Sequence, residues 1–424
     1  MNHALAPEDT VARAYARTAL GMLLLVYAFN FIDRIMLGIL APPIKLDLHL
    51  SDSQLGLLGG TAFALFYSAL GIPVGWLADR TSRVWIITLS LALWSAFAAA
   101  CGLAQNFAQL FLARLGVGVG EAGGVAPAYA LISDYFPPPQ RARALAVYSF
   151  GIPLGSAAGI LFGGLIAARV NWRVAFLVVG ALGLALAPLF RLSVREPVRG
   201  ALDALRPQAP PSLQRVARHL AAKGAFWRLA LGAASCSIMG YGVFFWMPSF
   251  FVRSYHLSLL QVSWSFSALT LVSGIAGIWL GGYFADRLGR QRRAAYALVP
   301  AGAFALCVPL YAVGMLAPAS PWSMPIFLLP MALALAWLGP TMSAIQHLVP
   351  ADMRAIASAL FLFIINLIGL GLGSWLLGRL SDFFAVRVGA DSLRYAILAG
   401  TGFYVLSAVL FLSASRRLAS DWQR

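Results

Sequence analysis

Long apolar runs, separated by short polar segments, fill most of the sequence. A helix needs roughly 20 largely apolar residues to cross a bilayer, and twelve runs meet or approach that length. We therefore expect an all-α membrane protein with twelve transmembrane helices, at residues 18–40, 53–77, 84–104, 107–133, 142–168, 173–193, 227–250, 259–284, 294–316, 322–347, 354–379 and 392–415.

The longest polar segment divides these runs into six and six. Residues 194–226 are basic, contain several prolines and are partly amphipathic. This composition predicts a cytoplasmic linker with an amphipathic surface helix. The expected domains are an N-terminal six-helix bundle at 1–193, the linker at 194–226, and a C-terminal six-helix bundle at 227–424.

Two pairs of similar segments recur at a constant spacing. HLSDSQLGLL at 49–58 resembles HLSLLQVSWS at 256–265, and GWLADRTSR at 75–83 resembles GYFADRLGR at 282–290. Both pairs are offset by 207 positions. The shared offset predicts duplication of a six-helix half, and two pseudo-symmetric bundles around a central path are typical of secondary transporters.

The composition indicates that most of the chain lies in lipid rather than in water. The residues are 60% hydrophobic and 11% charged, whereas a soluble protein is about 45–50% apolar and about 25% charged. A net charge of +16 would suggest nucleic-acid binding in a soluble protein. Here the basic residues stand in short segments between apolar runs, so we expect membrane lipids and no nucleic acid as partners.

The distribution of basic residues predicts the orientation. If the N-terminus is cytoplasmic, most of the 31 Lys and Arg residues fall on the inner side. We therefore expect a multi-pass protein of a bacterial inner membrane with both termini in the cytoplasm, and a first span that acts as its own insertion signal. The outer side receives only Lys45, Arg169, Arg173, Arg253, Arg379, Arg387 and Arg394.

No pattern of catalytic or metal-binding residues stands out. Cys101, Cys236 and Cys307 are widely spaced inside apolar runs, and the five histidines are scattered without HExxH or CxxC spacing. The nucleotide-binding pattern GxxxxGK[ST] is also missing, so we expect an ion gradient to supply the energy. No cofactor, metal or catalytic residue is predicted, although an intramembrane lipid enzyme stays open as an alternative of another class.

Four charges lie inside apolar runs, two of them in the fourth run. Arg114 and Glu121 are seven residues apart, which places them on one helix face about 10 Å apart along the axis. Gly116, Gly118 and Gly120 stand between them and allow close approach by a neighbouring helix or a ligand.

The other two charges, Asp33 and Arg34, are adjacent in the first run. Asp33 should lie about 22 Å from the cytoplasmic end of its helix, and Arg114 about 10 Å from the outer end of a helix that runs the other way. In a hydrocarbon core of roughly 30 Å these depths coincide. We therefore expect Asp33 and Arg114 to pair, with Glu121 nearer the cytoplasm.

These charges have a structural and a functional interpretation. A charge at the bilayer centre costs at least about 2.5–3.5 kcal/mol, so the four must be paired or hydrated. They can form a static network that locks the bundle. Alternatively, Asp33 and Glu121 exchange protons while Arg114 switches partners, because burial favours a neutral carboxyl group and a nearby Arg opposes it. Arg34 can meet an anionic substrate head group or simply face another helix.

The repeated loop resembles the G-x-x-x-D-R/K-x-G-R signature of the major facilitator superfamily. The second copy matches fully, and the first has Ser82 in place of the second Gly. Gly75 should let two helices approach closely, and the basic residues should bind nearby carboxylates such as Asp134. The predicted cytoplasmic gate comprises Gly75, Asp79, Arg80, Arg83, Asp134, Gly282, Asp286, Arg287 and Arg290.

Other segments point the same way. FPPPQRARALA at 136–146, VPADMRAIASAL at 349–360 and NWRVAF at 171–176 are similar to helix-entry segments of that superfamily. GIPLGSAAGILFGG at 151–164 is weakly similar to an antiporter motif, and its glycines at every fourth position fit either helix packing or a mechanistic role.

FNFIDR in the first run and RLGVGVGEA in the fourth resemble the spinster branch, whose members move lysophospholipids and sphingoid phosphates. The resemblance implies Asp33, Arg34, Arg114 and Glu121 as the functional set. It also implies an amphiphilic lysolipid-like or sphingolipid-like substrate. Together with the proton exchange considered for Asp33 and Glu121, this leads us to expect a proton-coupled transporter that acts as a monomer. A proton-driven exporter of drugs or small organic anions is the alternative.

The C-terminal half carries no comparable buried charge and should supply an apolar wall for such a substrate. Pro248 and Pro340 could mark flexible gate segments. The predicted cavity wall comprises Tyr27, Asn30, Tyr241, Phe244, Phe245, Trp246, Trp337 and Asn366.

Overall fold

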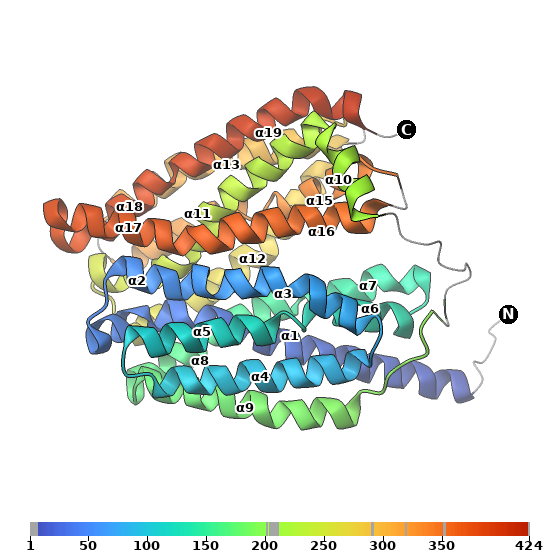
Figure 1. The fold of residues 1–424 in the computed structure, drawn as a ribbon. Coiled ribbons are helices and arrows are strands. Elements are labelled where there is room, and N and C mark those ends of the chain that lie inside the picture. Colours follow the sequence, from blue (N-terminus) through green and yellow to red (C-terminus); the bar gives the residue numbers. More distant parts are fainter. Residues whose placement is uncertain are drawn as a thin grey trace. The chain divides into compact units, whose positions relative to one another are not determined.

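The computed structural model describes residues 7–200, 202, 212–289, 292–318, 320–350 and 353–422. Arg290 of the predicted gate therefore lies outside the described residues. Within them all regular secondary structure is helical (Figure 1). The elements are α1 (Pro7–Leu48), α2 (Asp52–Gly56), η1 (Leu57–Thr61), α3 (Ala62–Ala78), α4 (Arg83–Leu103), α5 (Phe107–Glu121), α6 (Val125–Tyr135), α7 (Pro138–Ser149), α8 (Gly151–Arg169), α9 (Trp172–Ser193), α10 (Leu213–Ala221), α11 (Gly224–Ser254), α12 (Leu259–Gly289), α13 (Ala295–Leu316), η2 (Pro321–Phe327), α14 (Leu328–Leu333), α15 (Leu338–His347), α16 (Arg354–Ile365), η4 (Asn366–Leu370), α17 (Gly371–Val388), η5 (Gly389–Asp391), α18 (Ser392–Gly400) and α19 (Gly402–Asp421).

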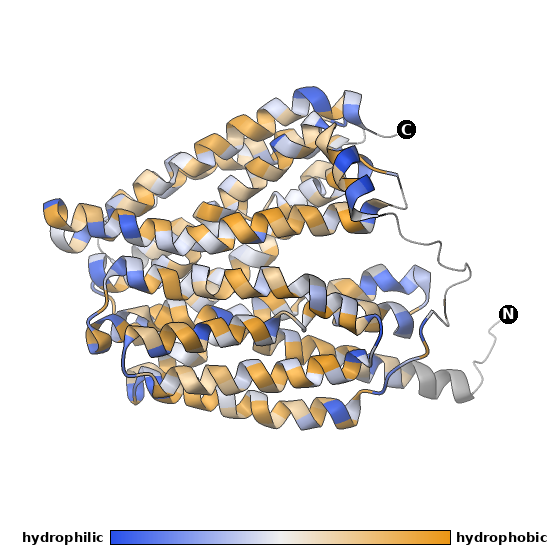
Figure 2. Cartoon of the chain, in the orientation of Figure 1, coloured by the Kyte–Doolittle hydropathy of each residue, from blue (hydrophilic) through white to orange (hydrophobic). Residues whose placement is uncertain are grey.

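Eleven helical segments of the described chain are long and apolar enough to cross a membrane. The last, Ile356–Asp421, has 66 residues, which as one straight helix would be about 100 Å long. The chain instead reverses at Gly389, which has a φ of 57°, and α17 and α18 then pack together. This segment therefore holds two spans, and the predicted all-helical membrane fold is confirmed. Figure 2 shows hydrophobic residues along the middles of the helices and hydrophilic ones at their ends.

The backbone reproduces the internal repeat in detail. His49 and His256, at equivalent positions, both have a positive φ, of 51° and 53°. Two residues later, Ser51 and Ser258 each exchange hydrogen bonds with a glutamine three positions on, which forms a capping box at the start of the next helix. A shared left-handed residue followed by a shared cap supports duplication of the half.

Contacts group the chain into two compact units. The first unit contains Met1–Met36 and Leu65–Arg206, and the second contains Leu37–Ala64 and Pro207–Arg424. The grouping differs from the predicted halves because the segment 37–64 packs with helices of the C-terminal half. The domain division drawn from the sequence stays a prediction, because it rests on the internal repeat and the linker, whereas these two units are defined by contacts.

In the first unit, glycines bring helix backbones into direct contact. A Cβ at Gly155 would lie 2.2 Å from the carbonyl oxygen of Ala28, and one at Gly159 would lie 2.7 Å from that of Ile32. Any side chain at these positions would push α8 away from α1. These contacts support the packing interpretation of the small-residue stripe at 151–164.

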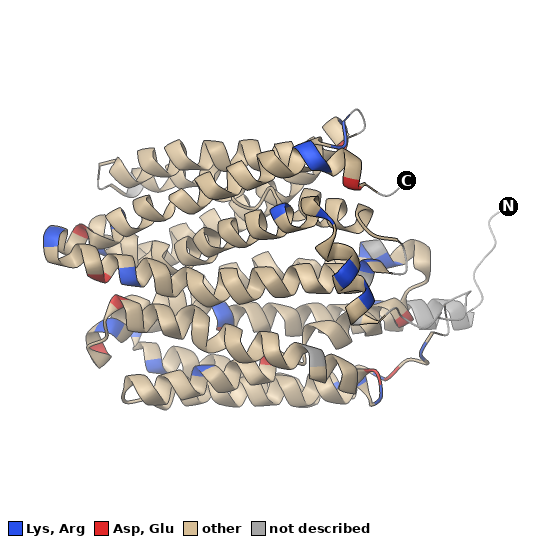
Figure 3. Cartoon of the chain, turned by 45° about the horizontal axis from the view of Figure 1, so that its top comes forward, with Lys and Arg blue, Asp and Glu red and all other residues tan. Residues whose placement is uncertain are grey.

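In the second unit, α11 is the most deeply buried long span and packs against α17 and α19. The short helix α10, within the linker segment, buries Val216 and Leu220 and exposes Arg215 and Arg218. Figure 3 shows the charged residues of the described chain concentrated at helix ends, with few inside the helices. The few that lie inside are the starting point for a functional site.

Candidate functional site

The charges inside the first unit come from α1 and α5. Asp33, Arg114 and Glu121 are completely buried, and the Arg34 side chain is 9% exposed. Groups of this kind are rare at membrane depth and mark pathways for ions or substrates.

The four side chains form two ion pairs. Nη1 of Arg114 lies 3.1 Å from Oδ2 of Asp33, and Nη2 of Arg34 lies 2.8 Å from Oε2 of Glu121. The pairing of Asp33 with Arg114, predicted from helix depths, is confirmed. Arg34 faces the neighbouring helix α5, which is one of the two options left open by the sequence. The two pairs join adjacent residues of α1 to residues two turns apart on α5.

Each carboxylate keeps one oxygen outside its ion pair. Among the described residues, Oδ1 of Asp33 and Oε1 of Glu121 are buried and have no hydrogen-bond partner. A buried charged oxygen without a hydrogen-bond donor is costly. These two atoms are therefore places where a proton would relieve an electrostatic penalty.

Aromatic side chains surround the Arg34 guanidinium. Its central carbon lies 5.0 Å from the ring centroid of Phe31 and 4.8 Å from that of Tyr67, within cation–π distance. Arg34 also contacts Oδ1 of Asn30 at 3.4 Å. Tyr27, one turn before Asn30, stacks on another tyrosine, Tyr148, with centroids 4.3 Å apart. Tyr27 and Asn30, predicted as cavity wall, are thus buried neighbours of the charge cluster.

The glycines of α5 fit it tightly against α4. A Cβ at Gly116 would lie 2.3 Å from the Phe97 ring, and one at Gly120 would lie 2.5 Å from the backbone nitrogen of Trp94. The close approach predicted from these glycines therefore occurs, and a helix rather than a ligand makes it. This contact fixes the height of Arg114 and Glu121.

A second ionic cluster in the first unit is centred on Arg83. Arg83 lies 2.6 Å from Asp134 and 2.7 Å from Glu196, and its side chain is 5% exposed. The bond to Asp134 was predicted, whereas Glu196 was missed because it lies in the linker, far along the sequence. Burial raises the pKa of Glu196, but hydrogen bonds from the Val84 N–H, Arg83 and Ser82 outweigh that effect and hold the pKa below its usual value.

The other predicted gate residues of this unit are more exposed. The Asp79 and Arg80 side chains face solvent; the carbonyl of Asp79 accepts a hydrogen bond from Arg199, and Arg80 stacks on Trp76 at 3.9 Å. The close helix approach predicted at Gly75 is not seen within its own unit, where no described atom comes within 4 Å of a Cβ at this glycine.

In the second unit, Gly282 likewise has no described atom of its own unit within 4 Å of a Cβ. Arg287 donates a hydrogen bond to the Tyr283 hydroxyl at 2.8 Å, and Asp286 is exposed. The gate role of both loop copies stays a prediction.

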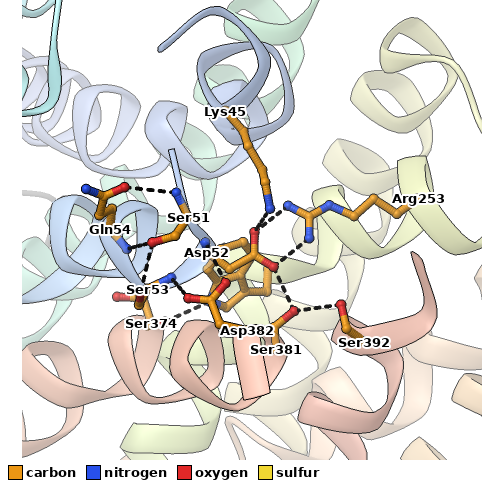
Figure 4. Close-up of polar contacts among 11 residues, drawn as sticks. Lys45, Ser51, Asp52, Ser53, Gln54, Arg253, Ser374, Ser381, Asp382 and Ser392 are labelled. Carbon is orange, nitrogen blue, oxygen red and sulfur yellow. Dashed lines mark hydrogen bonds and ion pairs between the residues drawn. The ribbon is translucent and has the colours of Figure 1, made fainter. Parts of the chain in front are cut away.

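A third polar cluster, in the second unit, was not predicted (Figure 4). Asp52 is 2% exposed. Its carboxylate accepts bonds from Lys45 at 2.5 Å, from both terminal nitrogens of Arg253 at 2.7 Å, and from the Ser381 hydroxyl at 2.7 Å. We call these four residues the Asp52 cluster. It joins the first two spans to α11 and α17.

Asp382 extends this cluster by capping α2. Its carboxylate accepts the backbone N–H groups of Asp52 and Ser53 at 3.0 and 2.8 Å. Free N–H groups at a helix start favour an anion, so this carboxylate replaces the partner that the helix itself cannot provide. The repeat itself holds one clue to this cluster: Asp52 departs from it, because the equivalent position holds Leu259.

Two π-helical turns, η1 and η4, contact each other next to the helices that carry Asp52 and Ser381. A Cβ at Gly60 in η1 would lie 2.3 Å from the carbonyl oxygen of Leu370 in η4, and one at Gly56 would lie 2.4 Å from that of Ser374. Thr61 also donates a hydrogen bond to the Gly371 carbonyl at 2.6 Å. Isolated π-turns often mark functional sites in helices.

Comparison with known proteins decides what kind of protein holds these clusters. The sequence profile described as "Major Facilitator Superfamily" matches residues 23–374. The chain belongs to the Major Facilitator Superfamily. It is therefore a multi-pass integral membrane transporter and not an enzyme.

Three relatives place this superfamily member further. It is 34% identical to an "MFS-type efflux pump" of Mycolicibacterium smegmatis over 96% of this chain and 94% of that protein. It is 31% identical to human "Protein spinster homolog 1", over 67% of this chain and 57% of that protein. A crystal structure of a "Bacterial Homolog to Human Lysosomal Transporter, Spinster", described as inward-facing and unoccupied, matches with a TM-score of 0.87 and 31% identity, over 97% of this chain and 99% of that one. The resemblance to the spinster branch is thus confirmed.

The residues of the C-terminal half that were predicted as cavity wall differ in burial, and two of them are packed inside the second unit. Trp246 is completely buried and donates a hydrogen bond to the Ser374 carbonyl at 2.8 Å, and a Cβ at Gly59 would lie 2.3 Å from the Phe245 ring. Both side chains therefore pack against the helical segments next to the Asp52 cluster, Trp246 against α17 and Phe245 against η1.

The remaining predicted wall residues differ in exposure. Trp337 is 7% exposed and packs against Phe361, whereas Tyr241, Phe244 and Asn366 are partly exposed. That any of these eight side chains lines a cavity stays a prediction.

Proposed function

We propose that this chain is a proton-coupled secondary active transporter of an amphiphilic, lysolipid-like or sphingolipid-like substrate, working by alternating access. The observation that carries the proposal is the buried charge cluster of α1 and α5. It contains two carboxylates and two guanidinium groups, and each carboxylate has a buried oxygen without a hydrogen bond among the described residues.

Proton coupling follows from the electrostatics of this cluster. Loss of one partner from a buried ion pair leaves an uncompensated charge that costs about 3–5 kcal/mol. A proton on Asp33 or Glu121 neutralises the carboxylate, weakens its hold on the partner Arg and frees that Arg to bind another anion. Arg34 is the residue best placed to meet a substrate head group, because its side chain keeps some exposure and lies among aromatic rings.

The Asp52 cluster supplies a gate that controls access from the outer side of the membrane. Basic residues predict that both termini are cytoplasmic, which puts the ends of the first, second, seventh and eleventh spans that carry this cluster on the outer side. The Asp52 carboxylate is bound by two cations and a hydroxyl, and so holds these four spans together. Close backbone contacts at Gly56 and Gly60, where a Cβ would not fit, pack the helices next to it. We propose that the cluster closes the outer side and breaks when the transporter opens outward.

The substrate class rests on kinship and on chemistry. The relatives include the spinster proteins, and the chain combines a charged N-terminal half with an aromatic and apolar C-terminal half. An amphiphile with a charged head and a hydrocarbon tail matches both halves. We further propose that the protein acts as a monomer in a bacterial inner membrane.

Flux into proteoliposomes tests the proposal. Purified protein would be reconstituted, and uptake of a labelled lysophospholipid would be followed with and without an inward-directed proton gradient. We expect the gradient to accelerate uptake by the native protein and to have no effect on Asp33→Asn or Glu121→Gln. Asp391→Asn, an exposed acid-to-amide change, is the matched control.

Two results would count against the proposal separately. A gradient response that survives in both carboxamide variants would eliminate proton coupling through this cluster. A native protein that moves no lysophospholipid but responds to the gradient with another solute would eliminate the lipid substrate.

One alternative is favoured by a specific observation. The relative that is 34% identical over 96% of this chain is called an efflux pump, which suits a proton-driven exporter of drugs or small organic anions. Mass spectrometry of molecules that copurify with the protein separates the alternatives. An enriched lysolipid supports the first function, and a small drug-like or polar ligand supports the second.

A further inference from the structure

An apolar groove of about 500 Å³ lies in the second unit, apart from the clusters described above. It is formed by α12, α13 and the segment that begins with α14. Phe284 and Leu288 of α12 and Leu298 and Leu306 of α13 line it and are 40–56% exposed. Both helices are candidate membrane spans, so the groove lies along segments that cross the bilayer.

One charged residue lies among the described residues that line the groove. It is Arg292, which is exposed. Arg292 stands between the spans Leu259–Gly289 and Ala295–Leu316. It therefore lies at the level where a helix leaves the hydrocarbon and where phospholipid phosphates are found.

Two glycines give the groove its shape. At Gly302 no described atom lies within 4 Å of a Cβ, so the missing side chain leaves free space along α13. At Gly281 the reverse holds, because a Cβ would lie 2.1 Å from the Ala336 carbonyl oxygen. The helix contact at Gly281 fixes the floor, and the open site at Gly302 leaves room above it.

We propose that this groove binds one anionic membrane phospholipid. An acyl chain lies along α12 and α13 past Gly302, and the head-group phosphate pairs with Arg292. The occupant is identified by charge complementarity: an apolar groove whose described lining includes one cation matches a molecule with a hydrocarbon tail and an anionic head. Basic pockets between spans on the cytoplasmic side recognise anionic lipids in this way, and the proposed orientation puts Arg292 on that side.

The lipid site is separate from the site of the transported substrate. The proposal therefore does not depend on which solute the protein moves. It lies outside the charge cluster of the first unit and outside the Asp52 cluster, and none of its lining residues belongs to the predicted cavity wall. The expected result of occupancy is a lipid that stays with the protein when bulk lipid is removed.

Native mass spectrometry of the delipidated full-length protein tests the proposal, with phosphatidylglycerol and phosphatidylcholine of identical acyl chains as probes. We expect the native protein to retain phosphatidylglycerol in preference. Arg292→Gln should reduce that preference about fivefold, which corresponds to roughly 1 kcal/mol for one basic group at the membrane surface. Gly302→Phe should abolish retention of both lipids by filling the groove.

The chain offers a matched control for each variant. Arg416→Gln removes an exposed cation near the end of another span, and Gly402→Phe adds a ring at an exposed helical glycine that also has no described atom within 4 Å of a Cβ. Both controls should behave like the native protein. Gly302→Leu repeats the filling test with a smaller side chain if the phenylalanine variant elutes as an aggregate.

Three results would overturn the proposal. They are equal retention of the two lipids by the native protein, unchanged selectivity in Arg292→Gln, and unchanged retention in both Gly302 variants. Equal losses in Gly402→Phe would also overturn it, because they would show that lipid covers the helix surface without a defined site.

Discussion

Replacing Asp52 by asparagine should release the proposed outer gate. The amide keeps the size of the carboxylate but loses its charge, so Lys45 and Arg253, at 2.5 and 2.7 Å, are left close together without a counter-ion. The two cations then repel each other across the junction that Asp52 had joined.

The size of the effect can be worked from the burial of the three groups. Removing one partner of a fully buried pair costs about 3–5 kcal/mol. The Lys45 side chain is 32% exposed and that of Arg253 is 19% exposed, so water solvates part of each cation and screens their repulsion. We therefore expect a shift of about 2–3 kcal/mol toward the open gate, or roughly 30- to 150-fold in the equilibrium.

Thiol labelling measures this equilibrium. Leu55 is completely buried in the closed junction, so Leu55→Cys should react with a membrane-impermeant maleimide only while the gate is open. The three native cysteines are buried and should give a low background. The labelling rate of Leu55→Cys should rise at least tenfold when Asp52→Asn is added.

Two further variants make the result interpretable. Asp391→Asn removes a carboxylate from the same end, where it pairs with Arg394 at 3.6 Å and is 44% exposed; such surface pairs contribute little, so labelling should not change. Arg253→Gln should also raise labelling, by less than an additive amount when combined with Asp52→Asn. Equal labelling in Asp52→Asn and Asp391→Asn would refute the gate.

Three other predictions concern stability in detergent, measured by thermal unfolding. Because the folded pKa of Glu196 lies below its usual value, its stabilisation is present above about pH 4.3 and is lost as pH falls through the folded pKa; Glu196→Gln should remove that part of the pH dependence and leave the curve above pH 6 parallel to the native one. Gly120→Leu should destabilise by about 1–3 kcal/mol or prevent folding, because the side chain meets the Trp94 backbone, whereas Gly21→Leu, with open space around it, should have little effect. His49→Val should cost about 1–2 kcal/mol because its φ is positive, and His49→Gly should be tolerated; equal melting temperatures for these two variants would contradict this.

The sequence predicted the spans well because their signal is strong. Runs of about 20 apolar residues have few other uses, and the constant offset between the two loop copies added the duplication. The pairing of Asp33 with Arg114 was also predictable, because the rise per residue fixes the depth of each group along a straight helix. Depth alone left the partner of Arg34 open, and the structure identifies it as Glu121.

The Asp52 cluster could not be predicted in the same way. Lys45, Asp52 and Arg253 stand at the ends of apolar runs, where a charge is ordinary and carries no penalty that demands an explanation. Their importance comes from burial by segments far apart in the sequence, such as α17 with Ser381. Glu196 was missed for the same reason, because a linker residue shows its partner only after folding.

The charge cluster of α1 and α5 has a further consequence for the energetics of the cell. Two carboxylates and two guanidinium groups sum to zero, so one bound proton gives this part of the membrane interior a charge of +1. Each elementary charge that crosses the membrane potential gains or loses about 2.3 kcal/mol per 100 mV. A carrier that moves one proton on this cluster together with a zwitterionic substrate would therefore respond to voltage as well as to acidity, and a potassium-valinomycin diffusion potential alone should drive its turnover; with a singly anionic substrate the two charges cancel and that potential should have no effect.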